Sequence, residues 1–373
     1  MVYLTLWCKN KAKKGVIQII MSNKDYILEA FVKLGQFISQ FSSEGITKNE
    51  TIPHNDLFFD GFKHQIKLAN EYNGWFTQKN IQFTLDGWSK QLSEDNLKQW
   101  TKDYNFSDVQ PKTVAIIMAG NIPLVGFHDF LSVLITGHNV LVKQSSNDKH
   151  LLPFLAKYLE TVAPELKGNI RFTEDKLENY DAVIATGSNN TARYFDYYFK
   201  DKPSIIRKNR NSAAILTGHE TSEQLDLLSE DIFRYYGLGC RNVSKLFVPK
   251  NYNFDAFFEA MYKWNPIINE AKYANNYDYN KAVYLMSEFD MLENGFLMIK
   301  EDQSYASPIA TVFYEFYDST EALQQKIKTD KDLIQCIVAS GFDDNEIPFG
   351  KTQKPELSDY ADDVDTITFL LKI

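Results

Sequence analysis

The chain has 373 residues, of which 44% are hydrophobic, so it is long enough for two or three domains with large cores. Its formal net charge of -9 argues against a nucleic-acid-binding surface, because such a surface needs a basic stripe. No apolar run approaches the ~18 residues of a membrane span, so we expect none.

The three cysteines are Cys8, Cys240 and Cys336, which are too few and too scattered for a disulfide framework. A chain of this kind belongs in a reducing compartment, and we expect the cytoplasm. The six histidines show no paired spacing with each other or with cysteine. We therefore predict no metal site and place the histidines at the surface or in loops.

The first part of the chain predicts helices. Residues 1–20 carry neither a helical period nor a turn pattern. They are either a non-native leader that precedes a true start at Met21, or a genuine short strand or tail. Residues 25–41 place apolar side chains on one face of a helix, and two or three more helices follow to about Tyr104.

From Pro111 onward, short apolar runs alternate with helical segments, which predicts βαβ units and a parallel sheet. The expected strands are residues 114–118, 139–143, 181–185 and 213–216. A second series contains strands at 246–249, 310–316 and 335–339 and helices at 254–264 and 319–327.

We predict an α/β fold with four parts. Residues 1–20 are the possible leader, 21–236 the helical lead-in with a cofactor-binding domain, 237–345 the catalytic domain, and 346–373 a tail. The tail is polar from 343 to 365, and residues 366–371 are predicted to form a final strand.

Cys240 is the candidate nucleophile. It stands between the Gly237-Leu-Gly239 turn and a run, residues 245–249, that has the pattern of a buried strand. The alternative is a buried, inert thiol. Nearby Arg241 or Lys143 is expected to favour the thiolate, whereas Cys336 is expected to be buried and unreactive.

The ends of the predicted strands carry the other candidates. Asn121 follows the first strand, where its amide could donate to an oxyanion or form an Asx turn. Lys143 ends the second strand before a helix expected near Lys149, which makes either an anion or ribose site or an ordinary helix cap. Gly187 and Ser188 end the third strand, where Ser188 could contact a pyrophosphate, although no G-x-G-x-x-G is present.

Four segments in order resemble motifs of the aldehyde dehydrogenase superfamily. They are Gly120-Asn-Ile-Pro, Gly137-His-Asn-Val-Leu-Val-Lys143, Ala185-Thr-Gly-Ser188 and Gly237-Leu-Gly-Cys240. Within it, Arg207-Lys-Asn-Arg-Asn-Ser-Ala-Ala214 and the acidic segment 359–366 resemble the LuxC-type acyl-CoA reductases, which supply fatty aldehyde in bacterial bioluminescence. The resemblance runs from about Met21 to the end.

This resemblance implies an aldehyde-dehydrogenase-like fold with a Rossmann-like cofactor domain, and it assigns roles. Cys240 matches the acyl-accepting nucleophile and Asn121 the oxyanion donor; Lys143 and Ser146 match the adenosine-ribose contacts, and Gly187-Ser188 the segment beside the pyrophosphate.

Two positions depart from the superfamily pattern. The glutamate base of oxidising members falls near Ile206 or Arg207, and no carboxylate occurs from 202 to 218. The glutamate that often holds the nicotinamide ribose falls within 304–308 and is also missing. Hydrolysis of an acyl-enzyme needs a base and reduction by hydride does not, so the first departure favours a reductase.

The resemblance implies reduction of long-chain fatty acyl-CoA to fatty aldehyde with NADPH through an acyl-cysteine. The alternatives are an oxidising aldehyde dehydrogenase and a non-reducing acyl carrier or scaffold. The acyl donor is expected to be a fatty acyl-CoA or an acyl-protein, with an acyl-transferase as a partner, and the chain is expected to form a homo-oligomer.

Overall fold

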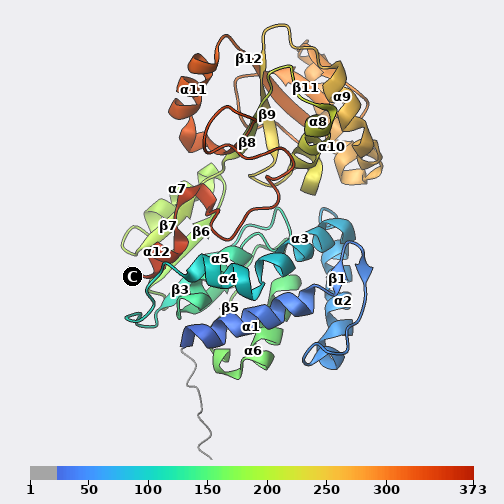
Figure 1. The fold of residues 1–373 in the computed structure, drawn as a ribbon. Helices are drawn as coiled ribbons and strands as arrows, with labels where there is room; N and C mark the ends of the chain where they lie inside the picture. The colour runs from blue at the N-terminus through green and yellow to red at the C-terminus, as the bar shows by residue number, and fades with distance from the viewer. Residues whose placement is uncertain (1–22) are drawn as a thin grey trace, which may run out of the picture.

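The computed structural model describes residues 23–373, which form two lobes, each built around its own sheet (Figure 1). The predicted leader, residues 1–20, lies outside the described residues. The lower lobe in the figure holds the N-terminal helices and a five-stranded parallel sheet, and the upper lobe holds a six-stranded sheet. No helix in residues 23–373 has the length and apolar character needed to cross a lipid bilayer.

The N-terminal helices form as predicted, with a short hairpin between the first two. Their bounds are α1 Asn23–Ile38, β1 Phe41–Ser42, β2 Gly45–Ile46, α2 Asn55–Tyr72, α3 Gln78–Gln91 and α4 Glu94–Thr101. Thr77 and Ser93 start α3 and α4 because their side chains accept hydrogen bonds from the backbone N–H of Asn80 and Asn96. Aromatic rings fill the core of this region, including Phe37, whose ring stacks on that of Tyr158 with 4.3 Å between the ring centres.

The sheet of the lower lobe has the order β5-β4-β3-β6-β7, with all pairs parallel. Its elements are β3 Thr113–Ile117, α5 Phe127–Ile135, β4 Asn139–Lys143, α6 Leu151–Val162, β5 Ile170–Phe172, β6 Ala182–Thr186, α7 Asn189–Tyr198 and β7 Ser204–Arg207. Ile117 pairs with Lys143 on one side and with Ala185 on the other, so three strands end together. The loops that carry the predicted site residues therefore leave the same edge of the sheet.

The sheet of the upper lobe has the order β10-β11-β12-β9-β8-β13. Its elements are β8 Asn211–Ile215, α8 Ser222–Phe233, β9 Val243–Pro249, α9 Asp255–Met261, α10 Ala271–Met286, β10 Met291–Glu293, β11 Met298–Glu301, β12 Thr311–Tyr317, α11 Thr320–Thr329 and β13 Ile334–Val338. β8 pairs with β9 and β13, so the chain enters this lobe after β7. We predicted that the cofactor-binding domain extends to residue 236, and this boundary assigned β8 and α8 to it. In the structure β8 belongs to the sheet of the upper lobe.

Helix α10 was missed by the sequence reading. Its buried positions are Tyr273, Tyr277, Asn280 and Tyr284, so the face that packs inward carries tyrosine and asparagine and no aliphatic side chain. The usual apolar stripe is absent, because the tyrosine rings supply the buried surface while their hydroxyls keep the segment polar.

The predicted final strand at 366–371 is wrong, because the segment forms helix α12, Thr366–Leu370. Asp365 caps it, its Oδ1 accepting from the backbone N–H of Thr368 at 2.9 Å. Ile367 and Leu370 are buried in the core of the lower lobe, so the tail returns there from the upper lobe (Figure 1). His138 meets it with its Nε2 at 2.9 Å from the carbonyl oxygen of Leu370, so this histidine is buried and the surface placement predicted for it is wrong.

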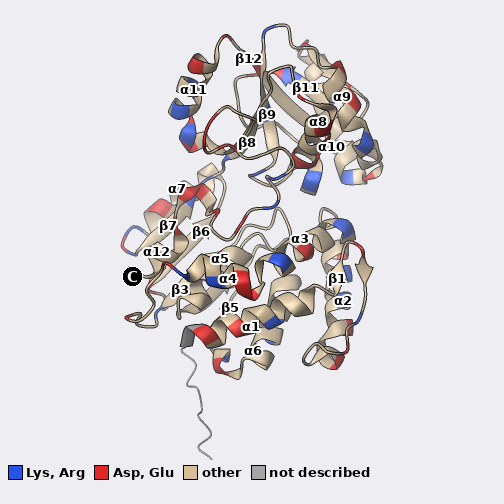
Figure 2. Ribbon diagram, viewed as in Figure 1, with Lys and Arg blue, Asp and Glu red and all other residues tan. Residues whose placement is uncertain are grey.

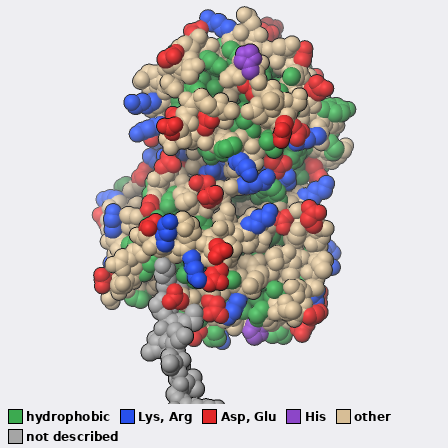
Figure 3. Space-filling view, viewed as in Figure 1, with side chains coloured by type: hydrophobic (Ala, Val, Ile, Leu, Met, Phe, Trp, Pro, Cys, Tyr) green, Lys and Arg blue, Asp and Glu red, His purple; other side chains and the backbone are tan. Residues whose placement is uncertain are grey.

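Charged residues lie over both lobes without a continuous basic stripe in the view of Figure 2. On the face shown in Figure 3, Lys and Arg side chains gather along the waist between the lobes, with some acidic side chains among them.

Candidate active site

The cysteine loop is held by a buried asparagine. Asn242 is 2% exposed; its Oδ1 accepts from the Gly239 N–H at 2.8 Å, and its Nδ2 donates to the carbonyls of Asp231 and Arg234 at 3.0 and 2.8 Å. A Cβ at Gly239 would lie 2.9 Å from that Oδ1, so the loop needs glycine there. Cys240 itself is exposed, as a nucleophile requires.

Two tyrosines before the loop have left-handed backbone conformations. Tyr235 and Tyr236 have φ of 56° and 60°, which costs a bulky residue about 1–2 kcal/mol each. The N-terminal helices stabilise both: the Tyr235 hydroxyl lies 2.8 Å from the Thr84 hydroxyl, and the Tyr236 ring lies 5.2 Å from that of Trp75. The helical lead-in therefore braces the cysteine loop, a role that no sequence signal indicated.

The surroundings of the Cys240 side chain favour the neutral thiol. Although the side chain reaches solvent, dense protein around it disfavours the thiolate and raises the pKa to about 11. Arg241 lowers that pKa, as expected, but by a smaller amount than burial raises it. The net effect therefore disfavours the thiolate. Lys143 takes no part, because its Nζ donates to the carbonyl of Asp175 at 2.8 Å.

The second cysteine lies close to the first. Cys336 is half-buried in β13, where the pairing with β8 shifts register between Ile334 and Ile337, so the prediction of a buried thiol holds only in part. The Ser212 hydroxyl lies 2.9 Å from Cys336 Sγ and donates to the carbonyl of Cys240 at 3.0 Å. Burial raises the pKa of the Cys336 thiol above its ordinary value.

Asn121 reaches the cysteine loop from the lower lobe. Its Nδ2 donates to the carbonyl oxygen of Leu238 at 2.7 Å, two residues before Cys240. An exposed amide at this place can turn from the loop to a charged oxygen that forms beside Cys240.

A buried carboxylate, which the sequence reading missed, holds the loop of Asn121. Asp148 accepts from the Leu124 N–H at 2.9 Å, where Leu124 has φ of 55°. The other oxygen of Asp148 is buried without a partner among the described residues, and burial raises the pKa of this carboxyl to about 6.

We expect Asp148→Asn to change the pH dependence of stability. Because the folded state raises the pKa of Asp148 from its ordinary value of 3.8, the wild type loses stability as the pH rises toward and through 6. From pH 5 to pH 7.5 the unfolding free energy of the variant should therefore rise by about 1 kcal/mol relative to that of the wild type. Any effect of the substitution that does not depend on pH leaves this change unaltered. Urea denaturation at both pH values measures this, with the exposed Asp201→Asn as control. Parallel pH profiles for Asp148→Asn and wild type would contradict it.

Lys143 and Ser146 line one cavity of about 430 Å³ at the carboxyl end of β4. Its other lining residues are Gln144, Lys149, Phe172, Thr173 and Glu174. Lys149 and Glu174 form an ion pair of 2.7 Å at this cavity, so it offers one further cation and one carboxylate. Helix α6 starts at Leu151 and has no side-chain cap, so the helix start that we expected near Lys149 lies slightly later.

Gly187 and Ser188 follow β6, which β3 separates from β4 in the sheet, and they do not line this cavity. Ser188 caps α7, its hydroxyl accepting from the Thr191 N–H at 3.2 Å. A Cβ at Gly187 would lie 3.0 Å from Thr191 and Phe195, so glycine permits the close approach of helix to strand.

Arg207 occupies the region where the superfamily pattern places the glutamate base. Its side chain is 9% exposed and forms an ion pair with Asp129, and its Nη2 donates to the Thr366 hydroxyl at 3.1 Å. A buried guanidinium in a fixed ion pair cannot remove a proton from water.

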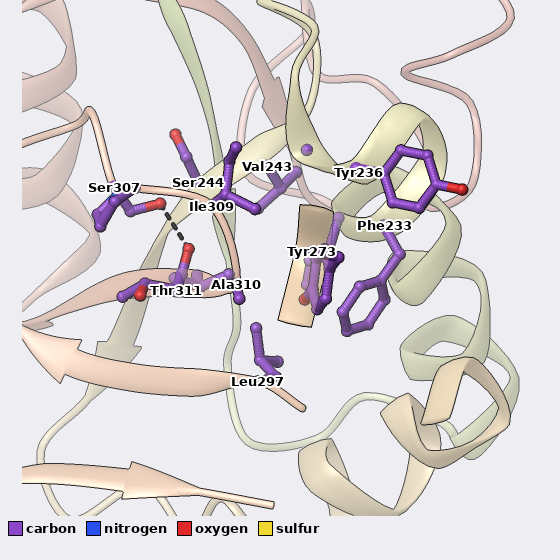
Figure 4. Close-up of a pocket in the computed structure, with 14 residues that line it drawn as sticks. Phe233, Tyr236, Val243, Ser244, Tyr273, Leu297, Ser307, Ile309, Ala310 and Thr311 are labelled. Carbon is purple, nitrogen blue, oxygen red and sulfur yellow. Dashed lines mark hydrogen bonds between the residues drawn. The ribbon is translucent and has the colours of Figure 1, made fainter. Parts of the chain in front are cut away.

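A second, smaller cavity lies beneath the cysteine loop (Figure 4). Phe233, Tyr236 and Tyr273 form one side, and Ile309 and Thr311 the other. Its volume is about 30 Å³, which is room for about one water molecule and too little for a long acyl chain.

The comparisons with solved structures show an aldehyde-dehydrogenase-like fold. The fold aligns with indole-3-acetaldehyde dehydrogenase AldA of P. syringae, solved with NAD+ and IAA, at TM-score 0.60 and 13% identity over 86% of this chain and 72% of that one. It aligns with a putative aldehyde dehydrogenase from Burkholderia cenocepacia at TM-score 0.61 and 10% identity, over 86% and 74% of the two chains. An aldehyde dehydrogenase from Bacillus cereus in its NAD+ complex gives TM-score 0.58 and 14% identity, over 86% and 72%.

Comparison with curated proteins gave no match. The family described as acyl-CoA reductase (LuxC) matches residues 40–261, a span that contains α2 to α4 of the helical lead-in, Asn121, the 430 Å³ cavity and Cys240. With its aldehyde-dehydrogenase-like α/β fold, the chain belongs to the LuxC acyl-CoA reductase family.

Proposed function

We propose that this protein reduces a long-chain fatty acyl-CoA to the fatty aldehyde with NADPH, through an acyl group on Cys240. The observation that carries the proposal is the position of Asn121, whose amide reaches the loop of the exposed Cys240 from the opposite lobe. A nucleophile beside a side-chain amide donor is the arrangement that acyl transfer needs.

The reaction would take place in two stages. Cys240 Sγ attacks the thioester carbon, the C–S bond to CoA breaks, and Asn121 donates to the oxyanion formed in between. When bound, NADPH would supply hydride for the acyl carbon, and the oxyanion so formed would expel the Cys240 thiolate and leave the aldehyde. Exchange of one thioester for another is nearly isoenergetic, so the site has to supply ionisation of the thiol and oxyanion stabilisation.

The 430 Å³ cavity supports the cofactor proposal. Lys143, Ser146 and Lys149 would hold the adenosine ribose and its phosphate, and Gly187-Ser188 would lie beside the pyrophosphate. The residues fit an anionic ligand, because two of the seven that line the cavity are lysines and one is a carboxylate already paired with Lys149. The choice of NADPH and of a long acyl chain rests on the family resemblance.

We propose a cytoplasmic homo-oligomer that receives its acyl group from acyl-CoA, or from an acyl-protein through a transferase partner. The few cysteines support the compartment. Exposed apolar side chains at the end of α10, Leu285 at 60% and Met286 at 86%, lie next to the edge strand β10 in the chain and support an interface.

Incubation of the purified protein with myristoyl-CoA, with and without NADPH, tests the proposed activity. The reductase should gain the acyl mass on Cys240 without NADPH and release tetradecanal when NADPH is added. Acylation without reduction would favour the carrier, and oxidation of added aldehyde with NAD+ would favour the oxidising dehydrogenase. Rapid hydrolysis of the acyl-enzyme to free fatty acid would reveal a base able to activate water.

For the cofactor site, we expect Lys143→Ala to raise the apparent KM for NADPH by about tenfold, because an ionic contact to a phosphate or ribose is lost. Acylation of Cys240 in the absence of NADPH should stay within about twofold of wild type, since Lys143 bonds to Asp175 and not to the cysteine loop. Lys176→Ala, an exposed lysine next to Asp175 in the loop after β5, is the matched control. An equal loss in both stages would contradict a cofactor role.

A further inference from the structure

The C-terminal tail contacts the cysteine site on both sides of Asp362. Before it, the Thr352 carbonyl accepts from Arg241 Nε at 2.7 Å. After it, the Thr366 hydroxyl accepts from Arg207 at 3.1 Å. Buried Asp231 fixes the start of this segment by accepting from the N–H groups of Gly350 and Thr352 at 2.7 and 3.0 Å. The segment between Thr352 and Thr366 is therefore held against the site at both ends.

Asp362 lies in a strained part of this segment. Asp362 and Asp363 have φ of 60° and 57°, a left-handed conformation that persists in a non-glycine pair only where the surroundings hold it. The Asp362 side chain is 11% exposed, and its Oδ1 lies 3.3 Å from Arg210 Nε. The carboxylate is thus turned inward, while Asp363 next to it is exposed.

Arg210 connects this carboxylate to the strand that lies beside Cys240. Its guanidinium donates to the carbonyl of Ile334 at 3.4 Å, at the start of β13. Two residues later on β13, Cys336 shares the Ser212 hydroxyl with the carbonyl of Cys240. A tail residue remote in sequence thereby joins the group of side chains around the nucleophile.

Charges of both signs act on the two ionisable groups. Burial raises the pKa of the Cys240 thiol, Arg241 and Arg207 lower it, and Cys336 and the Asp362 carboxylate raise it further.

Burial also raises the pKa of Asp362, although Arg210 and Arg207 lower it and Asp363 and Asp129 raise it. Burial therefore disfavours the anion of each group, and the charge of Asp362 opposes ionisation of the Cys240 thiol.

We propose that Asp362 is the proton acceptor for the Cys240 thiol during acylation and the proton donor to the CoA thiolate that leaves. This role rests on the acyl-transfer function proposed above.

The proton balance closes over the acylation stage. The S–H bond of Cys240 breaks and its proton passes to the Asp362 carboxylate through one water molecule, since no hydrogen bond in residues 23–373 joins the two side chains directly. The new S–C bond forms, the C–S bond to CoA breaks, and protonated Asp362 returns the proton to the CoA sulfur. Asp362 ends as the carboxylate, ready for the next turnover.

The test compares Asp362→Asn with wild type in two reactions of the same thiol. The first is alkylation of Cys240 by iodoacetamide at pH 7 to 10, read by peptide mass, which requires the thiolate but no proton transfer to the leaving group. The second is acylation by myristoyl-CoA without NADPH, read by intact mass. Loss of the negative charge should speed alkylation about threefold to tenfold at a given pH, because it lowers the thiol pKa. Loss of the proton acceptor should slow acylation about 100-fold.

Opposite changes in the two rates would support the proposal, because a merely structural defect would not speed one reaction and slow the other. Asp363→Asn, the exposed neighbour, should leave both rates within about twofold, and Asp362→Glu should recover part of the acylation rate. A parallel fall in both rates, or acylation at the wild-type rate in Asp362→Asn, would overturn it. If wild type itself gains no acyl group at Cys240, the proposed function fails, and the wild-type trace alone reveals this.

Discussion

Replacement of Cys240 by serine is expected to abolish acyl-enzyme formation, with a loss of at least about 10⁴-fold in reduction of acyl-CoA. The hydroxyl keeps the size and hydrogen-bonding ability of the thiol, so the loop held by Asn242 should fold unchanged. A hydroxyl, however, ionises far less readily than a thiol, so the serine oxygen is too weak a nucleophile to take the place of the sulfur. Intact-mass measurement after incubation with myristoyl-CoA checks the acylation, and NADPH absorbance checks the reduction.

Cys336→Ser is the matched control, because Cys336 shares the Ser212 hydroxyl with the nucleophile but is half-buried. It should still be acylated on Cys240. Acylation of Cys336 or Cys8 in the wild type would show that the nucleophile has been assigned to the wrong cysteine.

Asn121→Ala is expected to lower the rate of acylation by about 100- to 1000-fold, the usual cost of losing one oxyanion donor. The same change removes the 2.7 Å bond to the Leu238 carbonyl, so thermal stability has to be followed alongside the rate. If the amide acts on the oxyanion, kcat falls while the KM for acyl-CoA changes little, because the donor is needed in the transition state and not for binding.

Asn345→Ala, in an exposed loop of the upper lobe, is the control and should leave both constants unchanged. A rise in KM with an unaltered kcat would assign Asn121 to substrate binding alone. A large fall in thermal stability with proportionate loss of activity would instead make it a tether between the lobes.

The strands that carry Asn121, Lys143 and Ser188 could be predicted from the sequence, and they form within one residue of the expected bounds. Each is a short run of apolar residues ended by glycine or polar residues, a signal that acts over five or six positions. Because neighbouring parallel strands end at one edge, the loops after them could also be expected to lie together. The Gly-x-Gly turn before Cys240 could likewise be predicted from a signal that spans only a few residues.

The tertiary structure alone decided the features that depend on contacts between distant residues. Residues 366–370 alternate polar and apolar side chains, yet Ile367 and Leu370 have helical spacing, and the core of the lower lobe together with the Asp365 cap selects the helix. The same packing carries the tail past the cysteine loop and turns Asp362 inward beside Arg210. No local pattern distinguishes that aspartate from the exposed one next to it. The local sequence determines the backbone preference of a segment. The burial of a side chain and the charges around it arise only when segments hundreds of residues apart pack together.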